Sequence, residues 1–188
     1  DGPATDPSQV EDAATALAAM LTGASRPLLV FDLPAVRWGA LPAIEEFCAG
    51  LDIPYFCTLP AVHQAHTEHP QFMGILPGKD ADRQRIFSEA DLVVACGLIE
   101  SDVTTGFFSL GLDAKPVARL HTGYTQLGGP SWTDSAVYNG VPIAEVLTAV
   151  RHKITGDADG RRRWWTPPAP LPFAIASEDG DLTEEFVF

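Results

Sequence analysis

Four short apolar runs set the strongest limit on what this chain can fold into, and residues 92–96 are the clearest of them. That run, LVVAC, ends at Gly97, which allows the backbone to turn sharply. A run so short and so apolar is typical of a parallel strand that is buried on both faces. Similar runs occupy residues 28–31, 55–58 and 117–121.

Segments with helical periodicity lie between these predicted strands. The expected helices span residues 10–21, 40–51, 81–89 and 143–154, residues 60–78 are expected to form a long loop, and residues 136–138 a short edge strand. Strands that alternate with helices predict an α/β fold with a doubly wound, Rossmann-like parallel sheet. We expect about five or six strands, with helices on both faces of the sheet.

The length of 188 residues suits one α/β domain followed by a tail. We assign residues 1–155 to that domain and residues 156–188, which are rich in Gly, Asp, Arg and Pro, to a linker. The final residues, DLTEEFVF, look like the start of a helix. We therefore expect a piece of a longer polypeptide, in which the linker leads into a missing third domain.

Charge and cysteine content exclude several classes of partner. The net charge of −13 disfavours binding to nucleic acid or to an anionic membrane surface, because both would repel the chain. No apolar run is as long as a membrane-spanning helix, and no signal peptide is recognisable. The three cysteines form no CxxC pair and lie in apolar surroundings, which indicates reduced thiols and a cytoplasmic protein.

Ligands of open α/β sheets bind at the carboxyl ends of the strands. In this chain Asp32, Thr58, Gly97 and Asp102 follow or end predicted strands, so they form the candidate crevice. The first strand is followed by DLPAV and has no GxGxxG motif, so a backbone there cannot approach a pyrophosphate closely. A nucleotide-like fold without a nucleotide is favoured. A nucleotide-binding regulatory module and a small NAD-dependent enzyme remain as alternatives.

Three histidines, His63, His66 and His69, lie near Glu68 and raise the question of a metal site. Their spacing could bring two imidazoles together on a helix, but Pro70 would end any such helix at once. Histidines on the surface of a loop are the favoured interpretation, and we predict no metal site.

Other residues are weak candidates for catalysis. Cys57 and Cys96 have no neighbouring basic residue to activate a thiol, so we interpret both as buried core residues. Glu100 and Asp102 could exchange protons, but carboxylates in an acidic loop are usually solvated. The basic and aromatic residues 161–165, RRRWW, are expected to dock on a neighbouring domain. We therefore predict no catalytic residue in this chain.

A family resemblance adds to this interpretation. The segment ADLVVACGLIESDVTTGF, preceded by RPLLVF, GLDIPYFCTL and TEHPQFMG, resembles the central domain of thiamine-diphosphate-dependent 2-keto acid decarboxylases. Ser101 and Asp102, followed by TGF at residues 105–107, are similar to the pyruvate and indolepyruvate decarboxylase branch. The resemblance extends over about residues 10–154.

The resemblance implies a parent enzyme of three domains, assembled as a dimer or tetramer, that converts a 2-keto acid to an aldehyde and CO₂. Thiamine diphosphate and Mg²⁺ would bind to its outer domains, and the central domain would hold these in place. In some relatives the central domain binds FAD or ADP. The alternative interpretation of this chain is therefore a nucleotide-binding regulatory module of a related enzyme, such as an acetolactate synthase. This chain contains no GDG motif, so by itself we expect it to be inactive and without a cofactor.

Overall fold

The computed structural model describes residues 5–78, 80–128, 134–154 and 163–167. Its helices are α1 (Pro7–Gly23), α2 (Leu33–Arg37), α3 (Leu41–Leu51), α4 (Ala81–Glu89), α5 (Asp102–Thr105) and α6 (Ile143–Ile154), with short 3₁₀ turns at Leu59–Gln64 and Leu112–Ala114. Its strands are β1 (Pro27–Phe31), β2 (Tyr55–Thr58), β3 (Phe72–Leu76), β4 (Leu92–Cys96), β5 (Val117–His121), β6 (Tyr124–Gly128) and β7 (Ser135–Asn139).

The strands form one sheet of seven in the order β3-β2-β1-β4-β5-β6-β7. The strands from β3 to β5 are mutually parallel, whereas β6 and β7 run antiparallel to their neighbours. The prediction of a Rossmann-like α/β fold is confirmed. Two strands were not expected: β3 lies in the predicted loop and contains a glycine, and β6, YTQLG, has too many polar residues to stand out as an apolar run.

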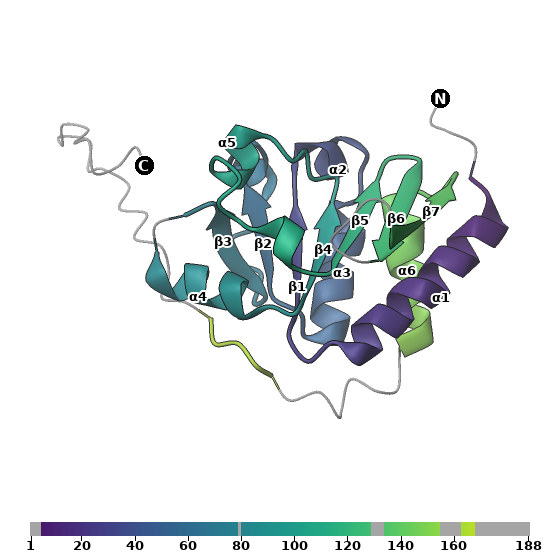
Figure 1. Cartoon of the computed structure of the whole chain (residues 1–188), viewed down its shortest axis with the longest axis horizontal. Coiled ribbons are helices and arrows are strands. Elements are labelled where there is room, and N and C mark those ends of the chain that lie inside the picture. Colours follow the sequence, from purple (N-terminus) through teal and green to yellow (C-terminus); the bar gives the residue numbers. More distant parts are fainter. Residues whose placement is uncertain (1–4, 79, 129–133, 155–162, 168–188) are drawn as a thin grey trace.

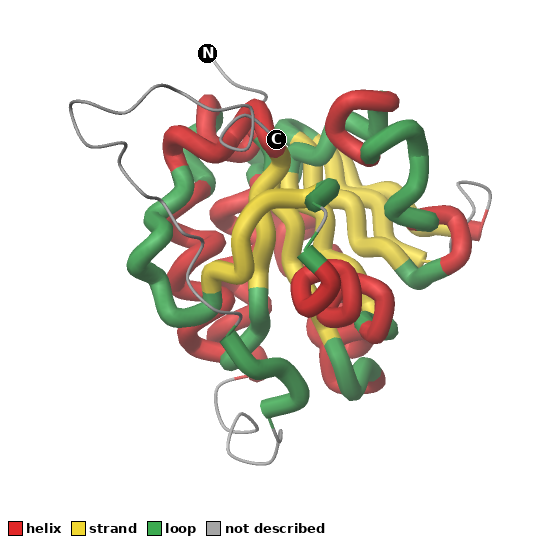
Figure 2. Tube along the Cα trace, turned by 90° about the vertical axis from the view of Figure 1, so that its left-hand side faces the viewer, coloured by secondary structure: helices red, strands yellow, loops and turns green. Residues whose placement is uncertain are grey.

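Side chains of each central strand point alternately to two separate hydrophobic cores. In β1, Leu29 and Phe31 pack in the core formed with α1, α3 and α6, while Leu28 and Val30 pack in the core beneath α4. Helices thus cover both sides of the sheet (Figures 1 and 2). This two-sided burial explains why the strands are apolar at every position. Among the described helices, none is both long and apolar enough to span a bilayer.

Helix α1 is longer than the periodicity predicted, because its cap lies earlier in the chain. The carboxylate of Asp6 accepts hydrogen bonds from the backbone N–H of Ser8 at 3.0 Å and of Gln9 at 3.3 Å, and Pro7 occupies the first turn. A proline fits there because the first helical N–H groups have no partner within the helix.

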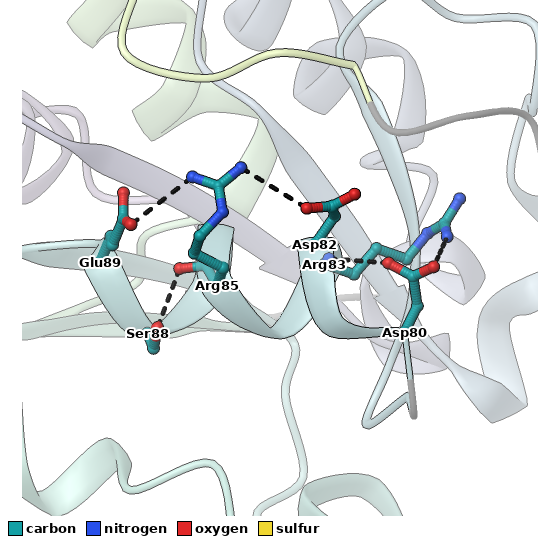
Figure 3. Close-up of polar contacts among 6 residues, drawn as sticks. All are labelled: Asp80, Asp82, Arg83, Arg85, Ser88 and Glu89. Atoms are coloured by element: carbon teal, nitrogen blue, oxygen red, sulfur yellow. Dashed lines mark hydrogen bonds and ion pairs between the residues drawn. The ribbon is translucent and has the colours of Figure 1, made fainter.

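An almost fully buried arginine attaches α4 to strand β3. The Nε of Arg83 donates to the carbonyl of Met73 at 2.7 Å, and its Nη1 lies 3.0 Å from the carboxylate of Asp80 (Figure 3). A Cβ at Gly74 would lie only 2.7 Å from that Nε, so the guanidinium needs a glycine beneath it. The pairs that Arg85 makes along the same helix are exposed, and such pairs contribute little to stability (Figure 3).

Residues 163–167, which we call the strap, lie at the end of the sheet opposite α2 and α5 (Figure 1). Arg163 donates through Nε and Nη2 to the carboxylate of Asp52 at 2.8 and 2.7 Å, and these bonds lower the pKa of Asp52. The indole of Trp165 donates to the carbonyl of Asp52 at 3.0 Å, and its ring packs in the α4 core. Residues 163–165 of the basic and aromatic run therefore dock on this domain, and the expected docking on a neighbouring domain is wrong for these three residues.

The strap lies in the segment that the sequence assigns to the linker, beyond the predicted end of the domain at residue 155. Trp165 of the strap belongs to the packed core and Trp164 packs against it, although both follow that boundary in the sequence. The rest of the predicted linker, residues 156–162 and 168–188, lies outside the described residues.

We expect the substitution Trp165→Ala to lower the free energy of unfolding by about 3 to 5 kcal/mol, the usual cost of removing a buried aromatic ring. Trp165 is 3% exposed, whereas Trp38 is 58% exposed, so Trp38→Ala is a matched control with an expected change below about 0.5 kcal/mol. Urea unfolding followed by circular dichroism measures both. Equal losses in the two variants would contradict the assignment of the strap to the core.

Candidate functional site

The carboxyl edge of the sheet brings together three of the four predicted crevice residues. Asp32 follows β1, Thr58 ends β2 and Gly97 follows β4, and these strands are neighbours in the sheet. The carboxylate of Asp32 accepts hydrogen bonds from the hydroxyl of Thr58, the backbone N–H of Leu33 at 2.7 Å and the backbone N–H of Ile99 at 3.2 Å. Asp32 is 1% exposed, so these bonds satisfy a charge that is almost completely buried.

Helix α2 lies directly against Gly97, which follows β4. The backbone N–H of Asp32 donates to the carbonyl of Cys96 at 3.1 Å, which holds the start of α2 to β4. A Cβ at Gly97 would lie 2.5 Å from the backbone nitrogen of Ala35, and the φ of Gly97 is +64°. Only glycine meets both conditions, and its contact with α2 takes up the place where such folds receive a ligand.

The fourth predicted residue, Asp102, is not part of this cluster. It is exposed on α5, where its carboxylate accepts a hydrogen bond from the backbone N–H of Val103 at 2.9 Å. Ser101 caps the same helix through the backbone N–H of Thr104. The polar residues of this loop therefore shape α5 instead of converging on a ligand.

Glu100 pairs with an arginine that the sequence interpretation did not single out. The Nε of Arg119 lies 2.6 Å from the carboxylate of Glu100, and Arg119 on β5 is 3% exposed. The signal in the sequence is a single arginine within the apolar run VARLH. A carboxylate that neutralises a buried guanidinium is a structural partner, so Glu100 is a poor candidate for proton transfer.

The predicted histidine cluster does not form a metal site in the part of the chain that the structure describes, where no three His, Cys, Asp or Glu side chains are suitably grouped. The Nδ1 of His66 lies 2.7 Å from Glu45 on α3. The imidazole of His69 packs edge-on against Tyr55 with ring centres 5.3 Å apart, and burial lowers the pKa of His69. These contacts attach the loop between β2 and β3 to the domain.

The three cysteines are buried core residues without a free thiolate. Burial raises the pKa of Cys57 to about 12, and it also raises the pKa of Cys48 and Cys96 above the usual range. All three are unpaired. Because the thiolate is the reactive form, none of these thiols is poised as a nucleophile.

Four exposed apolar side chains of residues 99–108, which we call the apolar rim, were missed by sequence reasoning. They are Ile99, Val103, Phe107 and Phe108. Phe107 and Phe108 are 85% and 65% exposed, and both have a positive φ, +56° and +62°. That backbone conformation is unfavourable for a bulky residue. It is maintained by bonds from the N–H of Phe107 to the carbonyl of Asp102 and from the N–H of Phe108 to the hydroxyl of Thr105.

These features define the class of the protein as an open α/β domain of Rossmann-like topology whose own side chains fill the ligand edge of the sheet. The family model for the central domain of thiamine pyrophosphate enzymes matches residues 14–149, and the chain belongs to this family. The predicted resemblance is thereby confirmed.

Curated relatives of the chain are decarboxylases. The pyruvate decarboxylase of Candida albicans is 24% identical in an alignment 193 residues long, which covers 97% of this chain and 32% of that protein. The pyruvate decarboxylase of Kluyveromyces lactis is 25% identical, with the same two shares. The alpha-keto-acid decarboxylase of Mycolicibacterium paratuberculosis is 28% identical over 93% of this chain and 30% of its own length. The chain thus spans about a third of the length of these relatives.

We expect no cysteine of the folded chain to react with iodoacetamide at about pH 8, because burial keeps the thiols protonated and shielded. In urea all three should be alkylated, which mass spectrometry of the intact chain detects. The unfolded sample is the control for reagent activity. Rapid alkylation of folded Cys57 or Cys96 would restore the nucleophile hypothesis.

Proposed function

We propose that this chain is the non-catalytic central domain of a thiamine-diphosphate-dependent 2-keto acid decarboxylase, and that it holds the catalytic domains of that enzyme in place. The parent reaction is the conversion of a 2-keto acid to an aldehyde and CO₂. The observation that carries the proposal is an alignment with decarboxylases from yeasts and from a bacterium. Nearly the whole chain aligns with about a third of the length of each of these proteins.

The residues that the structure describes form no site that fits thiamine diphosphate or its Mg²⁺. The sequence has no GDG motif, and the described residues offer no group of carboxylates or other ligands for a metal ion. The buried Asp32 carboxylate is bonded to three donors of its own chain, and Glu100 is bonded to Arg119. In this proposal the cofactor and Mg²⁺ therefore bind to the other domains of the enzyme.

The apolar rim supports a scaffold role, and its proposed occupant is another domain of the same enzyme. A domain that is a third of its relatives' length has neighbours to contact, and exposed phenylalanines are typical of the centre of an interface. The rim also carries the unfavourable backbone of Phe107 and Phe108, a strain that burial against a partner would offset. We further propose a dimeric or tetrameric parent enzyme in the cytoplasm, where the three unpaired cysteines stay reduced.

Calorimetry with thiamine diphosphate and Mg²⁺ tests the division of labour. We expect no heat of binding to the isolated chain and no aldehyde from pyruvate, because the described residues offer no ligands for the cofactor or for Mg²⁺. The positive control is a complete decarboxylase that contains this domain. Tight, saturable binding to the isolated chain would contradict the non-catalytic role.

Replacing both phenylalanines of the rim by asparagine, which tolerates a positive φ, tests the proposed contact. In the isolated chain the double substitution should change the free energy of unfolding by less than about 0.5 kcal/mol, because both rings are exposed. In the enzyme that carries the chain it should cost about 2 kcal/mol for each ring, the value of a buried phenylalanine.

Val137→Ser is the matched control for that experiment. Val137 is 51% exposed on β7 and lies outside the rim. Its substitution should leave both the isolated chain and the enzyme unchanged. A rim variant whose loss of stability in the enzyme is no larger than in the isolated chain would rule out this docking surface.

A further inference from the structure

We infer that Asp32 is a built-in anion: its carboxylate occupies the position in which folds of this class hold the charged group of a ligand, and it thereby closes the edge of the sheet to nucleotides. The inference does not depend on the parent reaction. It concerns the candidate crevice of Asp32, Thr58 and Gly97. It explains why a fold that binds FAD or ADP in some relatives would bind neither in this chain.

The donors around the carboxylate come from three different strand ends. The hydroxyl of Thr58 comes from β2, the N–H of Leu33 follows β1 and the N–H of Ile99 follows β4. Backbone N–H groups that converge at the carboxyl ends of parallel strands are the usual partners of a phosphate oxygen. Here all three donors are already bonded to the buried carboxylate of Asp32. A ligand phosphate would have to displace this side chain, which is part of the chain itself and cannot diffuse away.

The surroundings add steric closure to this competition. Ala35 lies so close to Gly97 that a methyl group could not be inserted between them. Residues of β1, β2 and β4 beneath the cluster are fully buried. The space that Asp32 occupies therefore matches an anion the size of a carboxylate, and not a nucleotide.

The test is to remove the built-in anion and supply a free one. Asp32→Gly deletes the carboxymethyl group, and formate is the probe because it supplies the same carboxylate and is small enough to enter the space left by that group. Thermal unfolding is measured in sodium formate and in sodium chloride of equal ionic strength. We expect a saturable rise of about 4 °C in the Tm of the variant once formate reaches about ten times its Kd, and no such rise for the wild-type chain.

Asp102→Gly is the matched control, because it removes the same side chain from an exposed position at the same edge of the sheet. Its Tm should be the same in formate and in chloride. Equal responses of the two variants would reveal a general salt effect and overturn the inference, as would an Asp32→Gly variant that does not distinguish formate from chloride.

Loss of folding in the variant leaves the test intact. If Asp32→Gly is unfolded in chloride, formate should restore its helical circular dichroism, and failure to do so overturns the inference. A second arm titrates ADP into the wild-type chain by calorimetry. Absence of binding supports closure of the edge, whereas saturable binding of ADP to the wild-type chain overturns it.

Discussion

The hydrogen bonds to the buried carboxylate of Asp32 are the interactions on which the carboxyl edge of the sheet depends. The carboxylate links the ends of β1, β2 and β4, and it caps α2, which in turn packs on Gly97. A buried charge is tolerated only when its hydrogen bonds are satisfied, so these contacts stabilise one another. Losing one donor would leave the charge under-solvated, and the relative positions of three strand ends are therefore fixed together.

The opposite end of the sheet is fixed by a different chemistry. There the strap brings the ring of Trp165 into the α4 core, and Arg163 binds Asp52 at the end of α3. Arg83 attaches α4 to β3 by a bond that a side chain at Gly74 would prevent. Both contacts join elements that are adjacent in space, so specific polar bonds as well as apolar packing hold the elements on the side of the sheet covered by α4.

The contacts within this domain agree with the scaffold role proposed above. At the carboxyl edge the carboxylates of Asp32 and Glu100 are bonded to groups of the same chain, and the cysteines are buried and protonated. What the domain presents to other molecules is the apolar rim, in which two phenylalanines are held outward against their backbone preference. Surface of this composition stabilises contacts between domains, and this agrees with the family to which the chain belongs.

The sequence by itself determined the class of fold, the strands β1, β2, β4 and β5, the edge strand β7, most helices and the family, because apolar periodicity and short motifs are local properties. It could not reveal β3 and β6, whose residues look like loop until neighbouring strands bury them. The tertiary structure alone decided that Asp32 fills its own crevice, that Asp102 stands apart and that Trp165 returns to the core. Those outcomes depend on hydrogen bonds and packing between residues distant in the chain, which no local pattern encodes.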